Sequence, residues 1–243
     1  MVLHDNPVRR FLAALGRQLG RPRAIVAVSA HWEARAPTVN ANPNPKTIHD
    51  FFGFEPQMYD LSYPAPGAPE LAHDVQRLLG SAGLRVALDT ARGFDHGVWT
   101  PLMLMYPEAD IPVTQVSVQR SESTQHHYLI GQALRELRDD GVLIFGSGNA
   151  THNLREMQGD GTAPPHWVSA FSGWLRDTVA GARAGDLLDY RESAPFAAKN
   201  HPTEEHFLPL FAAMGAGTPG VPGRLLHSSY TYGALAMDAY AFD

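Results

Sequence analysis

The chain has 243 residues, 44% of them hydrophobic, and a formal net charge of −6. The hydrophobic content supports a sizeable core, and the negative charge argues against nucleic acid or an anionic membrane as a partner. Cysteine is absent, which excludes disulfides, thiolate metal sites and cysteine nucleophiles. Because the sequence holds neither an apolar run of roughly 18 residues nor a secretory signal, we expect a cytoplasmic location.

The predicted elements alternate between helix and strand from the start of the chain. A helix is expected over residues 7–19, with Asn6 as its N-cap and Pro7 at its first position. A run of small and β-branched residues predicts a buried strand over 24–30. Residues 35–67 are rich in proline, asparagine and aromatic side chains, and we expect a long irregular segment there. Such segments are usually functional or disordered, and the aromatic residues argue against disorder.

The alternation continues to the C-terminus. Further helices are expected over 68–79, 123–138, 169–179 and 204–214, and one more directly after the loop GFDHG. Strands are expected over 85–89, 111–119 and 141–148. The last segment, RLLHSSYTYGALAMDAY, is expected to form a terminal hairpin. This pattern predicts an α/β fold, a single domain over residues 1–243 whose central sheet is mostly parallel or mixed and is flanked by helices.

Histidines follow three of the predicted strands. His31 lies in SAHWE, His96 in GFDHG and His152 in SGNATHNL. Ligands of open α/β sheets bind outside the carboxyl ends of the strands. Each of these histidines, taken alone, is readily explained as a structural hydrogen-bonding residue. Their recurrence in a chain without cysteine favours a nitrogen-rich site for Fe(II), Zn(II) or Mn(II).

A fourth histidine, His206, falls in the predicted helix 204–214. Thr203 is the expected N-cap, and Glu204 and Glu205 in the first turn suit the positive end of the helix. We expect at least one of these two glutamates to serve the helix cap alone. A position near the positive helix end favours a neutral imidazole in His206, which is the form that binds metals.

Seven blocks of the sequence stand out together. They are VSAHWE, HDFFGF, YDLSYPAPG, GFDHGVWTPL, MYPEADIPV, SGNATHNL and PTEEHFLPL. In this order they resemble the class III extradiol ring-cleavage dioxygenases, in the branch of the 4,5-DOPA dioxygenases that is related to the catalytic subunit of protocatechuate 4,5-dioxygenase. The resemblance extends from about Met1 to Tyr240. Seven blocks in a fixed order are far more specific than any one of them.

The resemblance implies an activity and a cofactor. Members of this family have an α/β fold with a mononuclear non-haem metal at the carboxyl edge of the sheet. They use Fe(II) to bind a catechol beside O₂ and cleave the ring next to the hydroxyl groups, and Zn(II) often occupies the same place. The implied partners are therefore a small aromatic diol and O₂.

The same resemblance implies roles for individual residues. His31 and His206 resemble metal ligands, and His152 resembles the acid/base histidine, which lies close enough to the metal to count as a third ligand. His96 resembles a second catalytic histidine that contacts the substrate. Other residues expected to line the substrate pocket are His49, Trp32, Arg92 and Asn149. Arg92 could pair with a carboxylated substrate, although no motif identifies which catechol is used.

The sequence departs from the family pattern at its start. Family members begin with a short strand that ends in HG-x-P, whose histidine is a further metal ligand, a few residues before the position of MVLHDNP. We therefore expect a domain shortened at its N-terminus, with the first family strand missing, and we do not expect His4 to replace that ligand. Either the start is truncated or the site is depleted, which would weaken metal binding and impair activity. An unpaired sheet edge would favour a homo-oligomer.

Two alternatives to a ring-cleaving dioxygenase stay open. One is a degenerate, non-catalytic member of the family that binds zinc. The other is a metal-dependent hydrolase that uses a metal-bound water. Oxygen consumption separates the dioxygenase from both.

Overall fold

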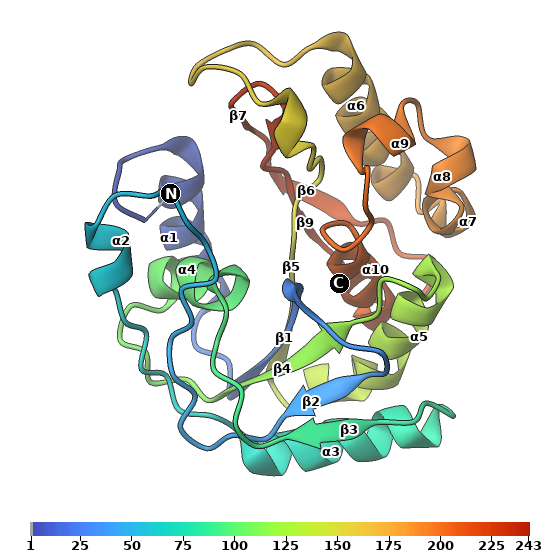
Figure 1. The fold of residues 1–243 in the computed structure, drawn as a ribbon. Helices are drawn as coiled ribbons and strands as arrows, with labels where there is room; N and C mark the ends of the chain where they lie inside the picture. Colours follow the sequence, from blue (N-terminus) through green and yellow to red (C-terminus); the bar gives the residue numbers. More distant parts are fainter. Residues whose placement is uncertain (1) are drawn as a thin grey trace. The chain divides into compact units, whose positions relative to one another are not determined.

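The computed structural model describes residues 2–243, which form two compact units (Figure 1). The first unit contains the described residues up to Gln119 together with Ala133–Ser147. The second contains Arg120–Gln132 and Gly148–Asp243. Each unit thus combines segments that are distant in the sequence, and the single domain over 1–243 stays a prediction.

The first unit is built on a five-stranded mixed sheet. The strand order is β3-β2-β4-β1-β5, with the bounds Ala87–Asp89, Thr38–Asn40, Val113–Val118, Ala24–Glu33 and Val142–Ser147. β1 pairs in parallel with β4 and β5, whereas β2 is parallel to β3 and antiparallel to β4. The predicted α/β class with a mostly parallel or mixed central sheet is therefore confirmed.

Helices flank this sheet. They are α1 (Pro7–Leu19), α2 (Gln57–Asp60), α3 (Pro69–Ser81), α4 (His96–Met105) and the 3₁₀ turn Arg135–Arg138. α1 begins as predicted, because the side chain of Asn6 accepts a hydrogen bond of 2.9 Å from the backbone N–H of Arg9. α3 packs against β2, β3 and β4, while α4 packs against β1 and α1. Gly16 permits the close contact of α1 with α4, since a Cβ there would overlap the carbonyl of Met105.

The carboxyl end of β1 is irregular. β1 and β4 pair in register from Ile25 to Ser29, and the pairing resumes only at Glu33. His31 lies within this interruption, in a strand that runs further than the predicted 24–30. Bulges of this kind redirect side chains at the edges of active sites. The fold therefore places an imidazole where β1 leaves its regular pairing with β4.

The second unit is mostly helical. It contains α5 (Thr124–Leu134, which enters the first unit at Ala133), the 3₁₀ turn Leu154–Glu156, α6 (His166–Ala180), α7 (Ala184–Leu188), α8 (Tyr190–Ser193), α9 (Ala197–Asn200) and α10 (Leu208–Ala216). The predicted terminal hairpin is present as two antiparallel pairs, β6 with β9 (Arg224–His227 and Ala239–Ala241) and β7 with β8 (Tyr230–Thr231 and Leu235–Ala236). Phe171, Tyr190, Phe207 and Phe211 form its aromatic core around the buried His201.

Several predicted boundaries were wrong. α10 begins at Leu208 rather than at residue 204, so His206 lies in the turn before the helix and not on it. The hydroxyl of Thr203 donates to Glu205 instead of capping a helix, and the helix starts at Leu208 and Pro209, where proline is well tolerated. β2 and α2 lie inside the segment predicted to be irregular.

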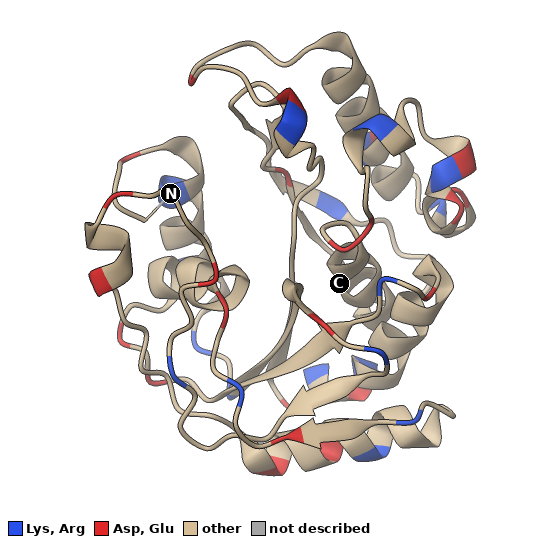
Figure 2. Ribbon diagram, viewed as in Figure 1, with Lys and Arg blue, Asp and Glu red and all other residues tan. Residues whose placement is uncertain are grey.

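Charge is distributed evenly in both units. Lysines and arginines are interspersed with acidic residues along the ribbon of each unit (Figure 2). No helix among residues 2–243 is long and apolar enough to cross a membrane.

Two candidate metal-binding groups

Two groups of side chains among the described residues have ligand atoms close enough to hold a metal ion. The first unit contributes His31, Asp50 and His96, and the second contributes His152, Glu205 and His206. Within each group the ligand atoms lie within 4.8 Å of one another. All four histidines are among the site residues predicted from the sequence, and the structure adds one carboxylate to each pair.

In the first group, a carboxylate lies between two imidazoles. Asp50 Oδ1 accepts a hydrogen bond of 2.8 Å from the backbone N–H of His96 and lies 3.0 Å from Nδ1 of the same residue. Asp50 Oδ2 is 3.6 Å from Nδ1 of His31. The two rings lie next to each other, with their centroids 3.8 Å apart. Burial raises the pKa of Asp50, but the hydrogen bonds from His96 outweigh it and lower the pKa to about 2, so the carboxylate is ionised at neutral pH.

A buried network holds the backbone around this group. The carboxylate of Asp95 is fully buried and accepts hydrogen bonds from Ser29 (2.6 Å), Gln115 (2.8 Å) and Arg92 (3.2 Å). Arg92 also donates to the carbonyl of His31, at 3.2 Å, and lies over the ring of Trp32. The positive charge of Arg92 is thus compensated inside the fold, so Arg92 and Trp32 support the end of β1.

Aromatic residues of the segment after β2 adjoin the first group. Phe51 packs edge-on against His96, with the ring centroids 5.5 Å apart. Nε2 of His49 donates to the carbonyl of Leu61, and its ring packs edge-on against Phe51. Phe52 is 91% exposed. The predicted aromatic segment therefore provides apolar surface beside His96.

In the second group, two imidazoles are stacked. The ring centroids of His152 and His206 are 3.4 Å apart and their planes differ by 10°. Glu205 Oε1 is 3.2 Å from Nδ1 of His206 and accepts a hydrogen bond of 2.8 Å from Thr203. The hydrogen bond with His206 lowers the pKa of Glu205 to about 2, so this carboxylate is also ionised at neutral pH.

Backbone hydrogen bonds fix the two segments that carry these rings. The N–H of Asn149 donates to the carbonyl of His206, and the N–H of His152 donates to the carbonyl of Asn200, both at 2.9 Å. Gly148 permits this approach, because a Cβ at that position would overlap the carbonyl oxygen of His206. The segments 148–153 and 200–206 are thus joined at both ends, which holds the rings in contact.

A buried histidine supports the same pair of segments. His201 is fully buried, and its Nε2 donates to the carbonyl of Ala150 at 2.9 Å. Burial lowers the pKa of His201 to about 3, so the ring is neutral at physiological pH. The sequence showed His201 only as a neighbour of the predicted helix.

The donor atoms suit a divalent metal. Imidazole nitrogens and carboxylate oxygens are ligands for Fe(II), Zn(II) and Mn(II). Oε2 of Glu205 is buried and has no hydrogen-bond partner among the described residues, which leaves an anionic oxygen for a cation to satisfy. From the sequence, at least one of Glu204 and Glu205 was expected to serve the helix cap alone, and Asp50 was not predicted as a site residue, although the HD pair in HDFFGF marks an acid next to a histidine.

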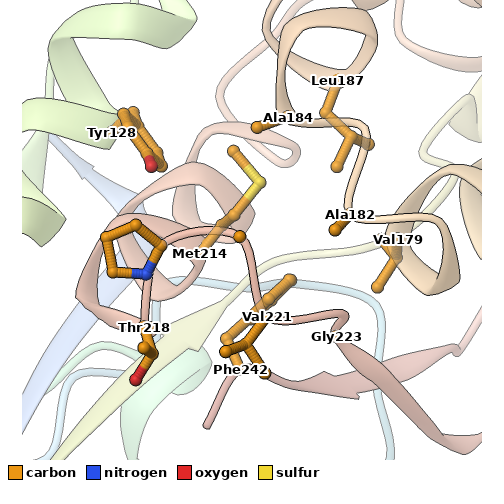
Figure 3. A pocket seen from close by; sticks show the side chains of 13 residues that line it. Tyr128, Val179, Ala182, Ala184, Leu187, Met214, Thr218, Val221, Gly223 and Phe242 are labelled. Carbon is orange, nitrogen blue, oxygen red and sulfur yellow. The ribbon is translucent and has the colours of Figure 1, made fainter.

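The second unit also contains a small cavity (Figure 3). It is lined by Tyr128, Met214, Phe242 and their neighbours and not by either metal-binding group. Its volume of ≈ 40 Å³ would hold about three water molecules, which is too little for an aromatic diol.

Comparison with known proteins gives the family. Residues 6–242 match the model of the catalytic LigB subunit of aromatic ring-opening dioxygenase. The chain is 44% identical to 4,5-DOPA dioxygenase extradiol of Beta vulgaris, over 100% of this chain and 92% of the relative. It is 40% identical to 4,5-DOPA dioxygenase extradiol of Escherichia coli K12, over 97% of this chain and 88% of the relative.

A solved structure supports the same relationship. The crystal structure of an uncharacterized protein from Escherichia coli K12 is 35% identical and superposes with a TM-score of 0.84, over 98% of this chain and 93% of that one. The resemblance of the seven sequence blocks is thereby confirmed. The chain belongs to the LigB family of metal-dependent aromatic ring-opening dioxygenases.

Proposed function

We propose that this chain is a non-haem Fe(II) dioxygenase that opens the ring of a catechol in the extradiol manner. In that reaction the ring bond beside the two hydroxyl groups breaks, and both atoms of O₂ enter the product as an aldehyde and a carboxylate. The observation that carries the proposal is the pairing of the four histidines implied by the resemblance, two in each group, beside an ionised carboxylate.

The proposal assigns a role to each histidine. His31 and His206 serve as metal ligands, and each has Nδ1 near a carboxylate oxygen, which strengthens an imidazole as a ligand through its other nitrogen. Bound Fe(II) would supply a Lewis acid for the catechol oxygens and electrons for O₂. Its nitrogen-rich ligand set would equally accept Zn(II), which has no redox chemistry.

Proton transfer falls to His152. Imidazole is the side chain that takes up and returns a proton most readily near neutral pH, which ring cleavage requires at a phenolic oxygen. The backbone N–H of His152 donates to the carbonyl of Asn200, and its ring stacks on the ring of His206. These two contacts fix its position. His96 contacts the substrate, and Phe51 and His49 provide apolar surface that excludes water beside it. Asn149 takes part through its backbone, by fixing His206.

The direct test is loading of the apo protein with Fe(II) under anaerobic conditions, followed by addition of a catechol and then air. A panel of DOPA, catechol and protocatechuate covers amino-acid, neutral and carboxylated substrates. We expect O₂ uptake, a coloured ring-fission product and no uptake with Zn(II). Stoichiometric Fe(II) without O₂ uptake on any substrate would instead indicate a non-catalytic metal-binding protein, and anaerobic cleavage of an ester or amide by the zinc form would indicate a hydrolase.

A further inference from the structure

Asp95 is the N-cap residue of α4, yet its side chain makes no capping hydrogen bond. The carboxylate is fully buried instead, where Oδ1 accepts a hydrogen bond from Ser29 on β1 and Oδ2 accepts from Gln115 on β4 and from Arg92. Apolar side chains of similar volume often stabilise a fold at least as well as a buried ion pair. The pair of Asp95 and Arg92 therefore calls for an explanation other than stability, and the geometry that it holds supplies one.

The same carboxylate is linked to both backbone polar groups of His31. The regular pairing of β1 with β4 and β5 stops at Ser29, and with β4 it resumes only at Glu33. Between these points side chains hold the backbone: Oγ of Ser29 accepts from the N–H of His31, and Nη2 of Arg92 donates to its carbonyl, both at 3.2 Å. Ser29 and Arg92 each also donate to Asp95, so one carboxylate orients both of the groups that hold His31.

Asp95 also fixes the start of α4, where His96 is the next residue and Gly97 follows. A Cβ at Gly97 would overlap Oγ of Ser29, so the lack of a side chain lets the helix start lie against the bonded pair of Ser29 and Asp95. The carbonyl of Gly97 accepts a hydrogen bond of 2.5 Å from Ser147, the pairing partner of Ser29 on β5. Neighbouring strands thus hold the helix at the residues directly before and after His96.

We infer that Asp95 is the positioning residue of the first group, which sets the imidazoles of His31 and His96 against each other. The ring centroids lie 3.8 Å apart. Asp95 acts on His31 through Ser29 and Arg92, and on His96 through the start of α4. This inference deepens the proposed function and rests on it for the chemistry of the two rings, which is metal binding by His31 and substrate contact by His96.

Two substitutions test the inference at different points of the network. Asp95→Asn keeps the shape of the side chain, but an amide has a single acceptor oxygen and cannot serve the donors on both sides of the carboxylate. Ser29→Ala leaves the carboxylate in place and removes its link to the N–H of His31. The matched control is Ser172→Ala, which removes the hydroxyl of another fully buried serine, on α6.

The readout is the nuclear Overhauser effect between the ring protons of His31 and His96 in the apo protein, assigned from His31→Gln and His96→Gln. We expect a strong effect in the wild type and in Ser172→Ala, and its weakening or loss in Asp95→Asn and Ser29→Ala. The circular dichroism spectra should stay the same, because only the end of β1 and the start of α4 shift. A loss of global stability alone would lower the melting temperature without changing the ring contact.

An unchanged ring contact in Ser29→Ala or in folded Asp95→Asn would overturn the inference, and so would an equal loss in Ser172→Ala. Should Asp95→Asn fail to fold, Ser29→Ala decides alone. After Fe(II) loading, we expect kcat for ring cleavage to fall by about 10- to 100-fold in Asp95→Asn, at equal iron content. Because the ring contact is measured without metal or substrate, its loss in a protein that cleaves no catechol would count against the proposed function and not against the role of Asp95.

Discussion

The imidazole rings of His152 and His206 are stacked, with their centroids 3.4 Å apart. Two hydrogen bonds between the segments that carry them maintain this contact. Under the proposed function, one ring of the pair acts as a metal ligand and the other as a proton carrier.

Replacing His152 separates those two roles. We expect His152→Ala to lower kcat for ring cleavage by about 10²- to 10⁴-fold, the usual contribution of a positioned acid/base group, while most of the Fe(II) stays bound. Steady-state O₂ uptake and metal analysis of the same sample measure both. His73→Ala, at an exposed site on α3, is the control and should match the wild type. Near-normal turnover in His152→Ala would exclude the acid/base role.

Glu205→Gln tests the carboxylate of the second group. The substitution keeps the size of the side chain but removes the charge beside His206 Nδ1 and on the buried Oε2. We expect Fe(II) affinity to fall by about 10- to 100-fold, as is usual when a carboxylate partner of a metal-binding histidine is lost. Isothermal titration with Fe(II) under anaerobic conditions measures this. Glu192→Gln on the exposed side of α8 should have no effect, and equal affinities for all three proteins would contradict the assignment.

The four histidines were predictable, because each lies in a short motif that follows a strand or precedes a helix. The sheet was also predictable, since its central strands are continuous apolar runs. The carboxylate partners were not. Asp50 meets His96 across 46 residues of chain, and although HDFFGF shows an acid next to a histidine, nothing local indicates which distant residue that acid contacts. Glu205 stands in TEEH, which has the composition of a helix start, and only the hydrogen bond from Thr203 shows that the helix has not yet begun.

Gly148→Ala tests the junction of the two segments. A Cβ at this position would overlap the carbonyl oxygen of His206, so Asn149 and His206 must separate. We expect a loss of about 1–3 kcal/mol in the free energy of unfolding, the usual cost of forcing atoms into a packed site, together with lower kcat. Urea unfolding and O₂ uptake measure the two effects. Gly80→Ala is the control, because no atom lies within 4 Å of a Cβ at that position in α3, and alanine should stabilise the helix by up to about 1 kcal/mol. Equal stabilities of Gly148→Ala and wild type would show that the junction tolerates a side chain.

The buried His201 predicts how the stability of the apo protein depends on pH. Burial lowers its pKa from 6.5 to about 3, so between these values the unfolded chain binds a proton that the folded chain does not. The stabilising contribution of the neutral ring is therefore complete above pH 6.5 and is lost as the pH falls toward 3. One such group accounts for up to about 1.4 kcal/mol per pH unit in this range.

His201→Gln isolates that contribution. Glutamine does not titrate, and its amide can still donate to the carbonyl of Ala150. In the wild type this carbonyl accepts a hydrogen bond from His201 Nε2. The variant should be less stable than the wild type at pH 7.5, because it packs less well among Phe171 and Phe207, but its stability should fall less steeply below pH 6.5. Urea unfolding at intervals from pH 7.5 to pH 4.5 gives both slopes. His73→Gln on the exposed side of α3 should keep the slope of the wild type, and parallel curves for His201→Gln and wild type would show that His201 is already protonated in the folded protein.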